Sequence, residues 1–176
     1  MEGLTVNDCI DERFNMKKAT RSALIHLKKL NGQFNDWLLA MAAYNAGPGR
    51  IREAIQNQMT RDFFDMYLPE ETERYIFRIL ALKEIIANRD RYGLHVDDRE
   101  MYRPVLISEV IVESNREFDS CILANAMDVS YRTYRMNNLH LRKYKLPKGV
   151  YRVNVPMEKK DSFVKKMRSY NFIQCQ

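Results

Sequence analysis

The feature that most constrains this fold is a short, almost wholly apolar run that stops at Gly47-Pro48-Gly49. A helix that is apolar on every side must be surrounded by other elements, so residues 35–44 predict a central, buried helix with Asn35 or Asp36 as its cap. The run is far shorter than the roughly 20 residues that cross a bilayer. The sequence therefore predicts a helical domain and no transmembrane segment.

Tyr44 and Asn45 stand where this helix ends, just before the glycine turn. A phenol and a carboxamide at a helix end, beside a turn whose backbone a ligand can approach closely, suit a hydroxyl-rich substrate. Taken alone, Tyr44 is more typical of a core tyrosine with a satisfied hydroxyl. The surrounding sequence has to decide between these two interpretations.

Composition excludes several classes of function. Hydrophobic residues make up 45% and charged residues 30% of the 176 residues, as in ordinary globular proteins. The net charge is +6, which favours polyanions, but no nucleic-acid-reading motif is present, so no nucleic-acid partner is expected. The three cysteines, Cys9, Cys121 and Cys175, form no metal-binding spacing, and no phosphate-binding glycine loop occurs. The sequence predicts no metal and no cofactor.

Apolar periodicity predicts helices over residues 17–30 and 71–88 on either side of the central run, with another over 49–58. The inward stripe of the last helix is predicted as Tyr75, Ile79, Leu82 and Ile86. After a charged connector, alternating apolar residues predict strands. The second half is predicted as strand 105–112, helices 117–127 and 130–137, and strand 150–155.

Two motifs then reveal a family resemblance. Ala43-Tyr44-Asn45-Ala46-Gly47 resembles the Ala-Tyr-Asn-Ala-Gly motif of the soluble lytic transglycosylases, a lysozyme-like group that cleaves peptidoglycan. Leu68-Pro69-Glu70-Glu71-Thr72-Glu73-Arg74-Tyr75 resembles the Pro-x-Glu-Thr-x-x-Tyr motif of that family. The resemblance covers residues 3–93 and is strongest to the membrane-bound, D-type murein transglycosylases. Further matching segments are Gly3–Val6, Asp11–Arg13, Lys18–Ala23 and Phe34–Trp37.

The resemblance implies the site. It assigns substrate binding to Tyr44, Asn45, Ala46, Gly47, Glu71 and Tyr75. In the family, the catalytic glutamate lies in a Glu-Ser motif upstream of all these residues, and no such motif precedes them here. This suggests an N-terminally truncated domain with no catalytic residue of its own, inactive alone. Glu113-Ser114 follows the Tyr-Asn motif and is interpreted as a decoy, while nothing in the sequence buries Asp11 or Glu12.

The second half resembles a lysin motif, a β-α-α-β module. The matching segments are Asp119–Ala124, Val129-Ser130, Asn137-Asn138 and Leu146–Tyr151, although Asn115–Phe118 replaces the usual Gly-Asp turn. The predicted fold class is mainly α: a partial lysozyme-like all-α domain followed by a small β-α-α-β module. The predicted boundaries are 1–93 for the first domain, 94–104 for a linker, 105–156 for the module and 157–176 for a basic tail.

The implied function is that of a peptidoglycan lytic transglycosylase-type protein, which acts on or binds the MurNAc-GlcNAc glycan strand. The alternatives are a non-catalytic peptidoglycan-binding protein and, less favoured, a basic nucleic-acid-binding protein. The resemblance implies the periplasm or cell envelope; without a visible export signal, a chain starting at Met1 would stay cytoplasmic. Missing covering helices would leave an apolar face open to self-association.

Overall fold

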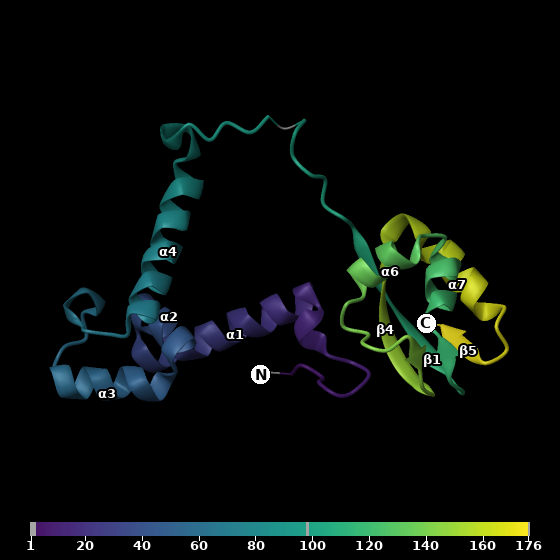
Figure 1. The fold of residues 1–176 in the computed structure, drawn as a ribbon, viewed down its shortest axis with the longest axis horizontal. Helices are drawn as coiled ribbons and strands as arrows, with labels where there is room; N and C mark the ends of the chain where they lie inside the picture. The colour runs from purple at the N-terminus through teal and green to yellow at the C-terminus, as the bar shows by residue number, and fades with distance from the viewer. Residues whose placement is uncertain (1–2, 98, 176) are drawn as a thin grey trace. The chain divides into compact units, whose positions relative to one another are not determined.

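The computed structural model describes residues 3–97 and 99–175 and divides them into two compact units (Figure 1). The helical unit comprises residues 20–102. The mixed unit comprises residues 103–175 together with the N-terminal segment 3–19. The predicted boundaries differ from this division, because they place residues 3–19 with the helical domain.

The helical unit contains four α-helices: α1 (Met16–Phe34), α2 (Trp37–Ala46), α3 (Pro48–Gln58) and α4 (Glu70–Ala87). α1 begins in the N-terminal segment of the mixed unit. Short 3-10 helices cover Phe63–Asp65 and Arg89–Tyr92. The side chain of Asp36 caps α2 by accepting a hydrogen bond from the backbone N–H of Leu39 at 2.8 Å.

The core of the helical unit forms around α2, as predicted. Leu39, Ala40, Ala42 and Ala43 of this helix are buried. They belong to one apolar cluster with residues of α1, α3, α4 and the connection after α3: Leu30, Phe34, Ile51, Phe63, Met66, Leu68 and Ile76. Trp37, expected in the core, is instead 54% exposed at the first turn of α2.

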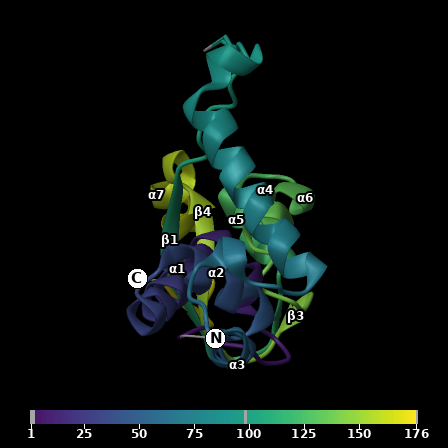
Figure 2. The ribbon, with the colours of Figure 1, turned by 90° about the vertical axis from the view of Figure 1, so that its left-hand side faces the viewer.

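The stripe predicted to face inward on α4 is only partly correct. The buried side chains of this helix are Thr72 and Ile76, in its first half, while Leu82 and Ile86 are exposed. α4 is long enough to extend past α2, as Figures 1 and 2 both show, so its second half runs beyond the packed core. Periodicity identifies an apolar face but does not show where its packing partner ends.

The mixed unit is built on an antiparallel sheet in the order β4-β1-β5. Its strands are β1 (Ile107–Ser114), β4 (Gly149–Pro156) and β5 (Ile173–Cys175), and β2 (Phe118–Asp119) pairs separately with β3 (Lys145–Leu146). Its helices are α5 (Cys121–Met127), α6 (Tyr131–Asn137) and α7 (Lys160–Arg168), with a 3-10 turn at Met157–Lys159. The predicted fold class, mainly helical with a small β-containing module behind it, is confirmed.

Two segments add to this unit beyond the predicted β-α-α-β order. The region expected as a basic tail forms α7 and β5, and its Phe163 and Met167 are fully buried in the core of the unit. The N-terminal segment is joined to the connection after α6 by backbone hydrogen bonds. Asp11 N donates to His140 O at 2.8 Å, and Arg142 N donates to Cys9 O at 2.7 Å.

Candidate functional site

The centre of the predicted site is the end of α2. Tyr44 lies in the last turn with 39% of its side chain exposed, and Asn45 beside it is exposed. The helix stops because Gly47 takes φ +91° and ψ 140°, a conformation that disfavours residues with a Cβ. A Cβ placed on Gly47 would have no neighbour within 4 Å, so the backbone at this turn is open to a ligand. Half-buried Ala46 packs on the core behind the turn.

The other predicted residues lie on the first two turns of α4. Glu71 is exposed, and Tyr75, one turn later on the same helix face, is half-buried. Burial raises the pKa of the Tyr75 phenol, and the nearby Tyr44 raises this pKa further. α2 and α4 pack against each other, so Tyr75 lies in the same region as Tyr44, although 30 residues of chain separate them. Glu73 holds the start of α4 by accepting a hydrogen bond from Leu68 N at 3.0 Å.

Two aromatic side chains near this region were missed by sequence reasoning. The ring of His26 on α1 contacts the ring of Tyr44, with centroids 5.6 Å apart. Nothing in the local sequence links these residues, because only the packing of α1 on α2 brings them together. Trp37 lies seven residues before Tyr44, which is two helical turns, so both exposed rings lie on one face of α2.

Neither Asp11 nor Glu12, two carboxylic side chains of the N-terminal segment, is suited to act as a general acid. Asp11 and Glu12 are buried, contrary to expectation. The hydrogen bond from the Arg13 guanidinium lowers the pKa of Asp11. Burial alone would raise the pKa of Glu12, but hydrogen bonds from the Lys18 ammonium and the Thr5 N–H outweigh it and lower this pKa. A general acid needs the opposite shift.

Glu71, predicted to bind substrate, and Glu113, interpreted as a decoy, are both exposed. Glu71 lies at the surface of the helical unit, and Glu113 lies on β1 of the mixed unit, opposite Val150. A carboxyl group that protonates a leaving oxygen near neutral pH needs an apolar pocket around it. Neither position provides such a pocket.

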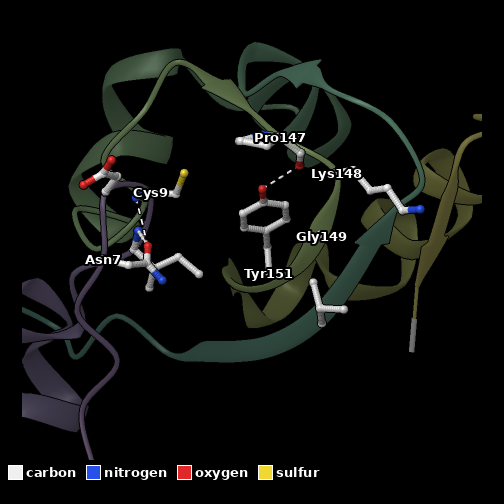
Figure 3. A pocket seen from close by; sticks show the side chains of 9 residues that line it. Asn7, Cys9, Pro147, Lys148, Gly149 and Tyr151 are labelled. Carbon is white, nitrogen blue, oxygen red and sulfur yellow. Dashed lines mark hydrogen bonds between the residues drawn. The ribbon is translucent and has the colours of Figure 1, made fainter.

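An open hollow of about 470 Å³ lies in the mixed unit, between residues 7–10 and residues 147–151 (Figure 3). Tyr151 is buried behind it and donates a hydrogen bond to the carbonyl of Pro147 at 2.6 Å. Asn7 folds the facing loop by accepting hydrogen bonds from the N–H groups of Cys9 and Ile10. The hollow thus reflects how the N-terminal segment packs against the turn before β4.

The described residues contain neither a cluster suited to a metal ion nor a membrane-spanning helix. Within residues 3–97 and 99–175, no three His, Cys, Asp or Glu side chains lie in position to hold a metal ion. No helix in this part of the chain combines the length and the apolar character needed to cross a membrane.

Comparison with known proteins supports the resemblance found in the motifs. Residues 2–67 match the family model described as the Transglycosylase SLT domain. The chain is 39% identical over 99 residues to Membrane-bound lytic murein transglycosylase D of Escherichia coli K12, and equally to its counterpart in strain CFT073. The match covers 53% of this chain and 22% of each relative, so the chain spans about a fifth of their length. The predicted similarity to lytic transglycosylases is confirmed for this part of the chain.

Proposed function

We propose that the helical unit binds the MurNAc-GlcNAc glycan strand of bacterial peptidoglycan, as part of a protein of the lytic transglycosylase type. The observation that carries the proposal is exposed Tyr44 beside the open turn at Gly47, with half-buried Tyr75 on α4, the helix that packs against α2. The segment that matches the SLT domain includes Tyr44 through Gly47. The names of both relatives identify murein transglycosylases.

The chemistry of these side chains suits a sugar polymer. A phenol offers an apolar ring for a sugar face and a hydroxyl that both donates and accepts hydrogen bonds. The Tyr75 hydroxyl is protonated at neutral pH, as tyrosine hydroxyls ordinarily are, and can donate a hydrogen bond. The carboxamide of Asn45 offers both donors and an acceptor, and the absence of a side chain at Gly47 lets the glycan approach the backbone. Glu71 would accept hydrogen bonds from sugar hydroxyls across from Tyr44.

We further propose that this chain alone binds glycan without cleaving it. None of the carboxylates considered above combines burial with a raised pKa, and the Glu-Ser motif of the family does not precede Tyr44. Digestion of purified peptidoglycan followed by mass spectrometry tests this proposal. We expect no 1,6-anhydromuropeptides, and their clear appearance would refute it. The cell envelope is the corresponding location.

Binding is tested by co-sedimentation with purified sacculi. Replacing Tyr44 by Ala removes a ring and a hydroxyl, so we expect retention to fall roughly tenfold. Tyr67→Ala is the matched control, because Tyr67 is 88% exposed in the same unit but lies outside the proposed site. Equal retention of both variants would overturn the assignment to Tyr44. Full retention of Tyr44→Ala would instead favour a peptidoglycan-binding protein that works through its lysin-motif-like module.

A further inference from the structure

α7 presents positive charge that the described residues leave unneutralised. Its inner side is fixed in the core of the mixed unit, where Phe163 and Met167 are fully buried. Its remaining sides carry exposed cations, and no carboxylate among the described residues lies within ion-pair distance of them. These cations are Lys160, Lys165, Lys166 and Arg168.

The arrangement of the charges distinguishes α7 from a scattered basic surface. Three of the four cations line an open hollow of about 450 Å³, together with Asp161 and half-buried Val164. From its first to its last residue this group of cations extends about 12 Å along the helix axis, with Lys166 on a different side of α7 from the other three. Lys159 is excluded from it, because its ammonium lies 3.5 Å from the carboxylate of Asp128.

We propose that the exposed cations of α7 bind a bilayer surface rich in anionic phospholipid headgroups. The apolar side chains of α7 are committed to the protein core, so the contact is electrostatic and needs no insertion. Four unpaired cations on one helix are typical of segments that bind anionic lipid. A bilayer presents many phosphates across a plane. Exposed cations on flexible side chains can reach several of them at once, whereas a closed pocket would suit a single small anion.

A simpler role for three of these residues must be separated from lipid binding. Lys165, Lys166 and Arg168 lie in the last turn of α7, where cations favour the helix dipole. This role would affect the stability of α7 but not its affinity for lipid. Stability and lipid affinity are therefore both measured for every variant.

The experiment is co-sedimentation of the full chain with vesicles of phosphatidylcholine, with or without an equal part of phosphatidylglycerol, at low salt. The test variant combines Lys165→Ser, Lys166→Ser and Arg168→Ser. The control combines Lys143→Ser, Lys145→Ser and Lys148→Ser, which removes the same charge from exposed positions elsewhere in the mixed unit. At about fivefold per cation, we expect the test variant to bind mixed vesicles roughly 100-fold more weakly, with a much smaller loss for the control.

Lys160→Glu is a second test variant, for the case that the triple variant misfolds. It should fold, because an acidic residue in the first turn favours the helix. We expect it to weaken vesicle binding while the unfolding temperature is unchanged. The proposal would be overturned if the wild-type protein did not bind the mixed vesicles. It would also be overturned if the test and control variants lost the same amount of vesicle binding. Loss of sacculus binding without loss of vesicle binding would also overturn it, and would assign α7 to the wall polymer instead. Because sacculus retention is measured separately through Tyr44, failure here leaves the proposed glycan binding intact.

Discussion

His140 illustrates how one buried side chain couples the mixed unit to pH. It is 2% exposed, and its Nε2 lies 2.8 Å from the carbonyl oxygen of Arg152. Facing a carbonyl, Nε2 must carry the proton and donate. Burial lowers the pKa of His140, and the bond to the Arg152 carbonyl offsets this only in part. The folded state therefore favours the neutral imidazole.

This preference predicts a loss of stability in mild acid. The unfolded chain takes up the proton first, so stability present above an unfolded pKa of about 6.5 is lost as the pH falls through the lower folded pKa. His140→Gln keeps a donor for Arg152 but does not titrate. Urea unfolding from about pH 7 to about pH 5 should show a shallower fall in the unfolding free energy for this variant. His95→Gln, in the helical unit, controls for the removal of an exposed histidine.

Gly47 predicts a second effect at the scale of one residue. Its φ of +91° strains any residue that carries a Cβ, although the space around it is open. Gly47→Ala should therefore lower the unfolding free energy of the helical unit by about 1–3 kcal/mol and weaken sacculus binding by displacing Tyr44. Gly49→Ala is the control: Gly49 is helical in α3 and equally open, so its replacement should be neutral or stabilising. Equal destabilisation by the two variants would show that φ at Gly47 is not limiting.

Among the elements, β4 shows how an edge strand is protected. It pairs with β1 on one side only. On its other side, Asn138 replaces a neighbouring strand: its amide oxygen accepts from Asn154 N at 2.8 Å, and its amide nitrogen donates to Asn154 O at 2.9 Å. On the same side of β4, His140 donates a hydrogen bond from Nε2 to the carbonyl oxygen of Arg152. A fully buried asparagine thus completes the hydrogen bonding of an edge that would otherwise be open to pairing.

Removing this clamp should be costly. Asn138→Ala leaves the two backbone groups of Asn154 without partners, so we expect the mixed unit to lose about 2–4 kcal/mol of unfolding free energy. Asn137→Ala should cost far less, since Asn137 bonds Asn154 through its backbone carbonyl. Denaturant unfolding measures both. A similar cost for the two substitutions would show that the side-chain hydrogen bonds of Asn138 to Asn154 do not set the loss.

The same elements show what the sequence could and could not predict. The apolar run after Asp36 predicts α2, because a helix that is apolar on every side is stable only when other elements bury it in the core. The alternation in Val153 and Val155 similarly predicts β4, since inward and outward residues alternate along a strand. The burial of Asp11 is not predictable locally, because it depends on a backbone contact with His140, 129 positions away. The contact between His26 and Tyr44 could not be predicted for the same reason, because the packing of two helices creates it and sequence spacing does not.

At the scale of the whole molecule, the chain builds two apolar cores that share no residue. Leu39 is fully buried in the core of the helical unit, and Leu123 is fully buried in the core of the mixed unit. The same substitution by Ala at either position leaves a cavity that should cost about 2–5 kcal/mol. If each core supports only its own unit, the two variants destabilise different parts of the chain.

Hydrogen exchange followed by mass spectrometry resolves the two parts separately. Leu39→Ala should accelerate exchange in peptides from residues 37–87 and leave those from residues 107–175 unchanged, and Leu123→Ala should do the reverse. Peptides from residues 5–15 provide the sharpest readout, because their backbone hydrogen bonds to His140 and Arg142 tie them to the mixed unit. They should follow Leu123→Ala although they precede the helical unit in sequence. If they followed Leu39→Ala instead, the N-terminal segment would depend on the helical core, and the division of the chain would have to be redrawn.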